Sequence, residues 1–336
     1  MAAIFAALTL AALVPWWPLR LAASVAGGLL MARGFILFHD FMHGSILKHS
    51  IIAKAVLYAY GLLLLTAPST WRASHNYHHA NVGKIIGSQI GSFPIMTIEM
   101  WRKASPMKRA YYRVARHPIT ILFSYLTIFF YSNTLETFLK HPRKHWDAGL
   151  AIVVHGGVVA ALWSLWGFAM ALYVLVLPFA IAAALGAYLF YAQHNFKGMY
   201  ILPLDEWSNP LASLKSCSYM KLGRIMRWIT GNIGYHHIHH LNLAIPFYRL
   251  PEAMNAVPET QHPVVTTLSP QDIRDCFRLK LWDEREERMV SYKEAGALLR
   301  LRGAERESAL RDSITVAAAA SLLFKRESEP RGSNGA

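Results

Sequence analysis

Three groups of histidines stand out among the 16 histidines of the sequence. His39 and His43 lie four residues apart, HNYHH covers residues 75–79, and HHIHH covers residues 236–240. Residues spaced i, i+3, i+4 share one face of a helix. Neutral imidazole is a good ligand for iron, zinc, copper and nickel. The spacing therefore predicts metal binding, with three imidazoles from each HxxHH group pointing one way.

The number of histidines bears on the number of metal ions. Eight clustered imidazoles exceed the six ligands of an octahedral ion, so two ions are implied. A structural zinc site is closed by four ligands and often uses cysteine, but Cys217 and Cys276 lie outside the histidine groups. A histidine-rich pair of irons beside apolar segments suggests O₂ chemistry on an apolar substrate. The predicted ligands are His39, His43, His75, His78, His79, His194, His236, His239 and His240.

A few further polar residues have expected roles beside these ligands. Asp40 follows His39 and could accept a hydrogen bond from the second nitrogen of a ligand, as carboxylates beside metal sites often do. Asn76 and Asn232 are weaker candidates for the same role. His237 breaks the i, i+3, i+4 face and is predicted not to be a ligand. His155 lies in an apolar segment and is predicted to be buried and hydrogen-bonded.

The composition points to a membrane protein. The chain has 336 residues, of which 54% are hydrophobic and 16% charged, whereas a soluble domain has about 25% charged residues. Residues 148–196 contain no Asp, Glu, Lys or Arg, and Arg20 is the only such residue in 1–32. About 20 apolar residues cross a bilayer. An ordinary soluble enzyme is therefore excluded.

The apolar segments predict two helical hairpins. Residues 2–14 and 21–38 form the first, and residues 148–192 form the second, with its turn near Gly167 or soon after. The apolar runs Ala55–Trp71 and Ile119–Leu135 are predicted not to cross, because a crossing would put the histidine groups on opposite sides. Of the 34 Lys and Arg residues, only Arg20 then lies on the side of the hairpin turns. This asymmetry places the histidine groups in the cytoplasm.

The expected architecture is an all-α integral membrane protein with four transmembrane helices in two hairpins, interfacial helices and a cytosolic histidine-rich cap. The net charge of +14 fits this topology and anionic lipid headgroups, and nucleic-acid binding is not expected. A surface helix is expected at 315–324 and a disordered tail from residue 327. The expected segments are 1–46 (first hairpin), 47–147 (interfacial, with the second histidine group), 148–193 (second hairpin), 194–312 (cap) and 313–336 (tail).

The sequence around the histidines resembles a known family. HDFMHGS at 39–45, HNYHH at 75–79 and GNIGYHHIHHLN at 231–242 resemble the three histidine boxes of the membrane fatty acid desaturases, closest to bacterial members of the plant-like acyl-lipid type. The resemblance implies two irons held by the nine histidines. It also implies insertion of a double bond into a long acyl chain with O₂ and two electrons. Some animal relatives carry an asparagine four residues before the counterpart of His194, where this chain has Phe190.

Partners and alternatives follow from the same residues. The sequence shows no ferredoxin-like cysteine spacing, no GxGxxG motif of a dinucleotide-binding fold and no fused haem domain, so it has no recognisable electron source of its own. A separate donor such as a ferredoxin or small cytochrome is therefore expected at the basic face. The resemblance favours a lipid-linked acyl substrate and the bacterial inner membrane. A lipid or carotenoid hydroxylase or ketolase would use the same ligands. A metal transporter is disfavoured, because transporters bind near the bilayer midplane.

Overall fold

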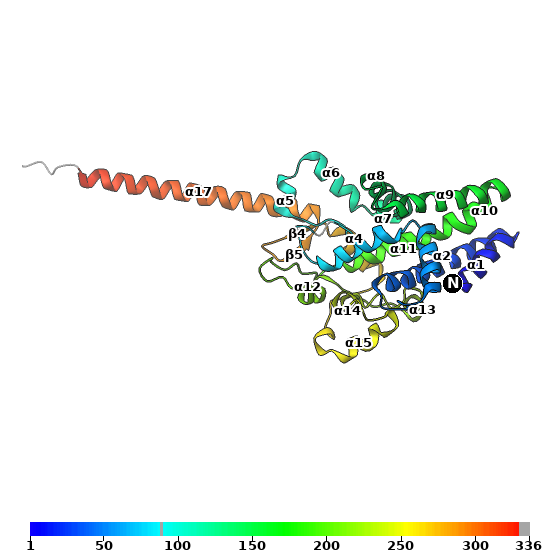
Figure 1. Ribbon diagram of the computed structural model, residues 1–336. Helices are drawn as coiled ribbons and strands as arrows, with labels where there is room; N and C mark the ends of the chain where they lie inside the picture. Colours follow the sequence, from blue (N-terminus) through cyan, green and yellow to red (C-terminus); the bar gives the residue numbers. More distant parts are fainter. Residues whose placement is uncertain (88–89, 329–336) are drawn as a thin grey trace, which may run out of the picture.

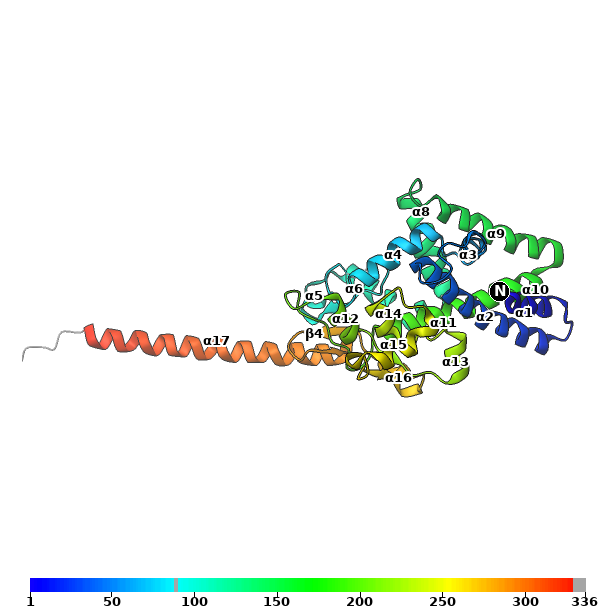
Figure 2. The ribbon, with the colours of Figure 1, turned by 60° about the horizontal axis from the view of Figure 1, so that its bottom comes forward.

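The computed structural model describes residues 1–87 and 90–328. A bundle of long helices occupies one end of the molecule, and shorter helices and loops form a cap at the other (Figure 1). The last helix, α17, projects away from the cap in both ribbon views (Figure 2). The bundle consists of α1 (Ala2–Leu13), α2 (Trp17–His43), α3 (Ile51–Leu63), α9 (Trp146–Trp166), α10 (Phe168–Ala171), η2 (Leu172–Val176) and α11 (Leu177–Gln193).

Three stretches of the described chain are long and apolar enough to cross a membrane: α2, α9 and the run Phe168–Gln193. The predicted crossing at 2–14 is not among them. α1 has 12 residues and spans about 18 Å at about 1.5 Å per residue, against a hydrocarbon core of about 30 Å. The helix ends at Leu13 because the residue before Pro15 takes an extended conformation, with ψ 122° at Val14. Four crossings therefore stay a prediction.

Both hairpins turn at the same end of the bundle. The second turns at Gly167, as predicted, where φ is +86° and a Cβ atom would meet nothing within 4 Å. The first turns between α1 and α2, and α2 packs along both α1 and α11. Arg20, which follows the first turn, lies over the ring of Tyr173 at 4.9 Å. The ribbon shows the two turns side by side, at the end opposite the cap (Figure 1).

The two shorter apolar runs do not form straight spans. The chain bends by 88° between α3 and α4 (Pro68–Ala80). Leu65 adopts a positive φ of 53° at this bend, and the backbone N–H of Thr66 donates to the carbonyl of Gly61 at 2.8 Å. The second run is divided into α7 (Pro118–Leu122) and η1 (Tyr125–Glu136). Beyond the bend, α4 contacts α2, α3 and α9.

The cap joins segments that are far apart in the sequence. β1 (Met96–Thr97) pairs in parallel with β4 (Leu281–Asp283), which pairs in antiparallel fashion with β5 (Arg288–Val290). β2 (Tyr219–Met220) pairs in parallel with β3 (Val265–Thr266). The cap helices are α5 (Ile98–Lys103), α6 (Pro106–Ala115), α12 (Asn209–Ser216), α13 (Arg224–Ile229), α14 (His236–Leu241), η3 (Phe247–Arg249), α15 (Leu250–Ala256), η4 (Pro258–Thr260) and α16 (Pro270–Arg278), whereas α8 (Thr137–Lys140) packs on η1 and α9.

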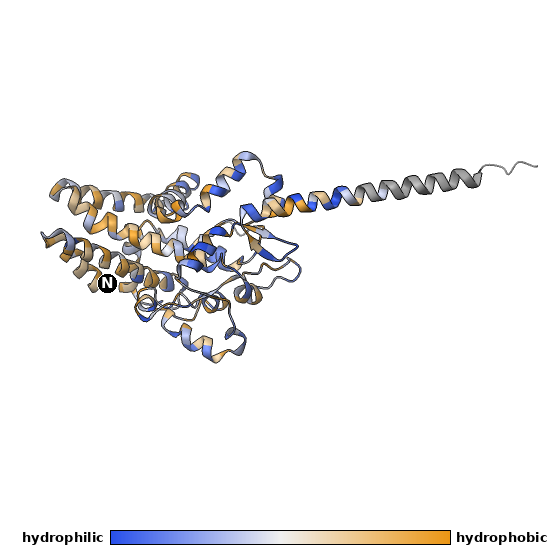
Figure 3. Ribbon diagram, turned by 180° about the vertical axis from the view of Figure 1, so that it is seen from behind, coloured by the Kyte–Doolittle hydropathy of each residue, from blue (hydrophilic) through white to orange (hydrophobic). Residues whose placement is uncertain are grey.

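The hydropathy of the surface agrees with this division. Hydrophobic residues predominate in the bundle, and hydrophilic residues are more frequent in the cap (Figure 3). Large apolar side chains on the bundle point outward, such as Val153 at 69% exposed and Leu165 at 67% exposed on α9. In water this exposure would be unfavourable, whereas lipid tails cover such a surface. The molecule is a membrane protein with a polar cap.

The C-terminal helix α17 runs from Tyr292 to Ser328. The predicted surface helix at 315–324 lies within it, and so does the predicted boundary between residues 312 and 313. Arg302 on α17 donates to both carboxylate oxygens of buried Asp283, at 2.9 and 2.8 Å. Of the disordered tail predicted from residue 327, residues 329–336 lie outside the described residues.

Candidate metal centre

The structure brings all nine predicted histidine ligands together where the bundle meets the cap. They form two groups, and within each group the ring nitrogens lie within 4.8 Å of one another. Eight of the nine lie on three helices, α2, α4 and α14. The ninth, His194, directly follows α11. Helices α2 and α11 come from the bundle, so the apolar segments position part of a polar site.

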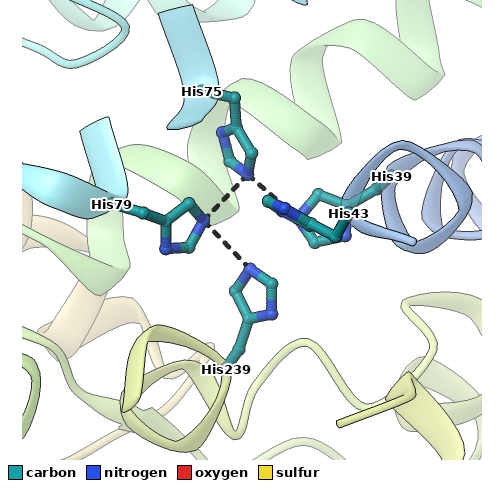
Figure 4. A group of neighbouring side chains, drawn as sticks. All are labelled: His39, His43, His75, His79 and His239. Atoms are coloured by element: carbon teal, nitrogen blue, oxygen red, sulfur yellow. Dashed lines mark hydrogen bonds between the residues drawn. The ribbon is translucent and has the colours of Figure 1, made fainter. Parts of the chain in front are cut away.

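The first group contains five histidines from three helices: His39, His43, His75, His79 and His239. Their rings converge on a common centre (Figure 4). The Nε2 atom of His75 lies 3.1 Å from that of His39 and 3.0 Å from that of His79, which lies 3.2 Å from that of His239. The Nε2 atom of His43 is buried without a hydrogen-bond partner in the described chain.

The second group contains four histidines: His78, His194, His236 and His240. Their Nε2 atoms form a closed ring, with separations of 3.1 Å (78–194), 2.9 Å (194–236), 3.2 Å (236–240) and 3.2 Å (240–78). Burial lowers the pKa of His194 to about 4 and the pKa of His236 and of His240 well below the ordinary range. Such imidazoles are neutral at pH 7, and each keeps a lone pair for a metal.

Each HxxHH triplet is divided between the two groups. On α4, His75 and His79 join the first group while His78 joins the second. On α14 the assignment is reversed, since His236 and His240 join the second group and His239 the first. The prediction that all three imidazoles of a triplet point one way was therefore too simple. Residues i and i+4 share a centre, and residue i+3 reaches the neighbouring one, so two helices between them serve both groups.

The donor set fits two metal ions. Two nitrogens in adjacent positions around one ion, each about 2.1 Å from it, would be about 3.0 Å apart. The Nε2 separations of 2.9–3.2 Å in both groups match this value. Neither group contains a thiolate or a carboxylate. All-imidazole sets suit iron, zinc, copper or nickel rather than magnesium or calcium.

Asp40 holds the first group from the side of α2. It is 2% exposed, and its Oδ1 lies 2.9 Å from Nδ1 of His39. Its Oδ2 accepts a hydrogen bond from the backbone N–H of Phe247 at 2.7 Å. A carboxylate in this place fixes the ring orientation and leaves Nε2 of His39 free for a metal. It also ties α2 to the first residue of η3, a contact that nothing in the sequence indicated.

The two asparagines predicted beside the ligands lie elsewhere. Asn76 is exposed, because it follows His75 by one helical position and points about 100° away from it. Asn232 has a positive φ of 56° and donates to the carbonyl of Phe247 at 3.1 Å. It shapes the loop before α14 and contacts no ligand ring. Among the described residues, neither asparagine forms a hydrogen bond to a ligand ring.

The helix α4 is fixed at both ends by other segments. The Asp147 carboxylate accepts a hydrogen bond from the backbone N–H of Ser69 at 2.8 Å, at the first turn of α4. Ser69 Oγ also lies 2.9 Å from Nδ1 of buried His145. Near the other end, Asn209 on α12 donates to the carbonyl of His79 at 2.7 Å. The histidine helix is therefore held between the second hairpin and the cap.

Aromatic side chains line the apolar side of both groups. The Trp71 ring centroid lies 4.3 Å from that of His75, 5.4 Å from that of His39 and 5.6 Å from that of His43. Phe190 lies 4.8 Å from the ring of His78 and 5.4 Å from that of His194. Phe190 thus stands beside the second group without a donor atom.

The two histidines predicted not to be ligands are placed as expected. His237 lies outside both groups, and its Nε2 is 3.2 Å from the carbonyl of Thr260. His155 is 5% exposed on α9. Its Nδ1 lies 2.7 Å from the carbonyl of Leu63, and its Nε2 lies 2.5 Å from the hydroxyl of Tyr125. His155 therefore ties α9 to α3 and η1.

An apolar helical bundle that carries two adjoining all-histidine groups at its polar end is typical of a membrane-bound metal-dependent oxidoreductase. The chain belongs to the fatty acid desaturase family, since the family model for fatty acid desaturase matches residues 15–270. It is accordingly an oxidoreductase of the desaturase type.

Individual relatives support the same membership. The chain is 29% identical over 278 residues to a fatty acid desaturase of Bacillus subtilis, covering 82% of this chain and 78% of the relative. It is 22% identical to an sn-1 oleoyl-lipid 12-desaturase of Synechocystis, covering 74% and 71% of the two chains. It is 24% identical to an sn-1 acyl-lipid omega-3 desaturase (ferredoxin) of Nostoc, covering 66% and 63%.

Proposed function

We propose that this protein introduces a double bond into a long acyl chain, with O₂ and two electrons, at a pair of irons held by the nine histidines. Two hydrogens leave the acyl chain, and O₂ is reduced to two waters with two electrons from a donor and two protons. The observation that carries the proposal is the pair of adjoining histidine groups at the end of an apolar bundle. The name of the Synechocystis relative favours a lipid-linked acyl chain.

The ligands divide as five and four in this proposal. His39, His43, His75, His79 and His239 would hold one iron, and His78, His194, His236 and His240 the other. Bound iron would supply the O₂-dependent oxidation of an unactivated C–H bond, which no side-chain base achieves. The chain itself supplies the donor atoms, their orientation and the exclusion of water.

Named residues perform these tasks. Asp40 orients the ring of His39. Trp71 and Phe190 cover the apolar sides of the two groups, and an acyl chain would approach along such surfaces without carrying water. On the cap side, α12 packs against α14 and holds α4 through Asn209. Water is thereby kept from both faces of the centre, which favours oxidation of the acyl chain over side reactions.

The electrons would come from a separate protein. The chain carries 34 Lys and Arg against 20 Asp and Glu, and a basic face attracts an acidic donor. The name of the Nostoc relative includes ferredoxin. We therefore propose a ferredoxin or a small cytochrome, docking on the cytoplasmic side of a bacterial inner membrane. Turnover that falls steeply with salt would support this, and salt-independent turnover would contradict it.

The activity is tested by expression in a host poor in polyunsaturated lipids, supplied with a ferredoxin and its reductase. Total acyl chains are profiled by mass, beside a His78→Ala control. New chains lighter by two hydrogens, absent from the control, are the expected result, and the double-bond position gives the regiochemistry. Chains heavier by one oxygen would instead identify a hydroxylase. Unchanged acyl chains with a working donor would refute acyl oxidation.

A further inference from the structure

His194 is placed differently from the other eight histidines. They lie within helices, so the helical backbone sets their positions. His194 lies one residue beyond the last residue of α11, with φ −121° and ψ 11°. Among the described residues, the contacts of its Nδ1 are long, 3.4 Å to the carbonyl of Ser216 and 3.7 Å to Sγ of Cys217. Other contacts must therefore hold this ring in the second group.

Two buried amides flank His194 and tie it to distant segments. Gln193 and Asn195 are each 1% exposed. Gln193 donates to the carbonyl of Ile233, just before α14, at 2.8 Å. Asn195 donates to the carbonyl of Cys276 at 2.6 Å and to that of Leu279 at 3.1 Å, at the end of α16. The backbone on both sides of His194 is thereby fixed to the cap.

A buried guanidinium completes this arrangement. Arg116 is 1% exposed. Its Nη2 donates to Oδ1 of Asn195 at 2.6 Å, and its Nη1 donates to the carbonyl of Pro94 at 2.7 Å. Within residues 1–87 and 90–328, no carboxylate forms an ion pair with it.

The surroundings of Arg116 compensate its charge only in part. The guanidinium carbon lies 5.1 Å from the ring centroid of Tyr191 and 5.6 Å from that of Tyr112. A second cation, Lys280, donates to the carbonyl of Arg116 at 2.5 Å. Burying a cation without an acid is costly, and charge-assisted hydrogen bonds are among the strong ones. Two short hydrogen bonds, to Asn195 and to the carbonyl of Pro94, compensate this charge, and the one to Asn195 connects it to the segment of His194.

We infer that Arg116 is a positioning residue for the second histidine group, acting through Asn195 on the backbone of His194. The guanidinium fixes the Asn195 amide, which orients its two donors toward the end of α16 and locks the segment that carries His194. This inference rests on the proposed function, in which His194 is a metal ligand. The link crosses 79 residues of sequence.

The experiment measures metal binding by the purified full-length protein in detergent. The metal-free protein is titrated anaerobically with Fe²⁺ against a competing chelator, and Co²⁺ serves as a probe whose visible spectrum reports the ligand geometry. The variants are Arg116→Gln, Asn195→Ala and the double variant. Tyr112→Phe is the matched control, because it removes buried hydrogen bonds to Lys280 and Met96 and keeps the ring beside Arg116.

The wild type is expected to bind two ions. Arg116→Gln is expected to weaken the second ion by about 10–100-fold, as is usual when a partner of a metal ligand is lost, and to change the Co²⁺ spectrum of that ion alone. Asn195→Ala is expected to act alike, and the double variant no more than the larger single effect, because both lie on one path. Tyr112→Phe is expected to keep both affinities.

Wild-type affinities in Arg116→Gln would overturn the inference, and so would an equal loss in Tyr112→Phe, which would show a general loss of stability. Additive losses in the double variant would also overturn it. If Arg116→Gln does not fold, Asn195→Ala and the conservative Arg116→Lys decide the question, with a smaller loss expected for Lys. A wild type that binds fewer than two ions would overturn the two-metal proposal itself.

Discussion

Replacing Asp40 by asparagine tests how the first histidine group is held. In the wild type each carboxylate oxygen accepts one hydrogen bond, from Nδ1 of His39 at 2.9 Å and from the backbone N–H of Phe247 at 2.7 Å. An amide has only one acceptor oxygen. Whichever way it turns, its NH₂ group faces one of these two donors, and Asp40 is too buried, at 2% exposed, for water to relieve the conflict.

The size of the effect follows from the lost bond. A hydrogen bond to a charged group contributes about 1.5–3 kcal/mol, and about 1.4 kcal/mol corresponds to a tenfold change in an equilibrium constant. Asp40→Asn is therefore expected to weaken metal binding in the five-histidine group by about 10–100-fold. The four-histidine group is expected to keep its affinity. Iron per chain and Fe²⁺ affinity are measured on the purified protein, together with desaturation in the expression host.

Asp283→Asn provides the control. Asp283 is also buried, at 1% exposed, but it pairs with Arg302 in the cap, away from the histidines. It is expected to lower stability and leave both metal affinities unchanged. If Asp40→Asn retained wild-type affinity at both groups, the carboxylate would not be what orients His39. If Asp283→Asn lost metal equally, the effect would be one of general unfolding.

Four further results are expected. His78→Ala should leave about one iron per chain by metal analysis and abolish desaturation, because His78 serves only the four-histidine group. His237→Gln should retain full metal content, since it lies outside both groups. Tyr125→Phe should lower the free energy of unfolding by about 1 kcal/mol without changing metal content, because its hydroxyl bonds only His155 among the described residues. Burial, and then the Arg116 charge, lowers the pKa of Lys280 from 10.5 to about 8. Between pH 8 and pH 10.5 the unfolded chain binds more protons at Lys280 than the folded chain does. The free energy of unfolding should therefore rise with pH across this range, by at most about 3 kcal/mol. A Lys280→Met variant should lack that rise when thermal unfolding is measured as a function of pH.

Local patterns were enough to predict several elements of the fold. The charge-free stretch 148–196 predicts a hairpin because hydrophobic helices need no long-range partner to be recognised, and Gly167 turns it as expected. The break between residues 14 and 21 was also predicted, and α1 ends at Leu13. Hydropathy did not show that α1 is shorter than the helices that could cross a membrane. The prediction that the run 55–71 does not cross came only from requiring the histidines to meet, and the 88° bend between α3 and α4 came from the structure.

The sequence by itself indicated which histidines gather into the two groups, because the chemistry of imidazole and, for eight of the nine, the helical spacing are local properties. It also determined the membrane location, through the scarcity of charge. Only the tertiary structure decided how the ligands are shared: His75 and His79 with His239, and His78 with His236 and His240. It alone joined Arg116 to Asn195. Such contacts depend on how helices that are far apart in the chain pack against each other. The residue pattern of one helix shows which of its faces is buried, but not which other helix covers that face.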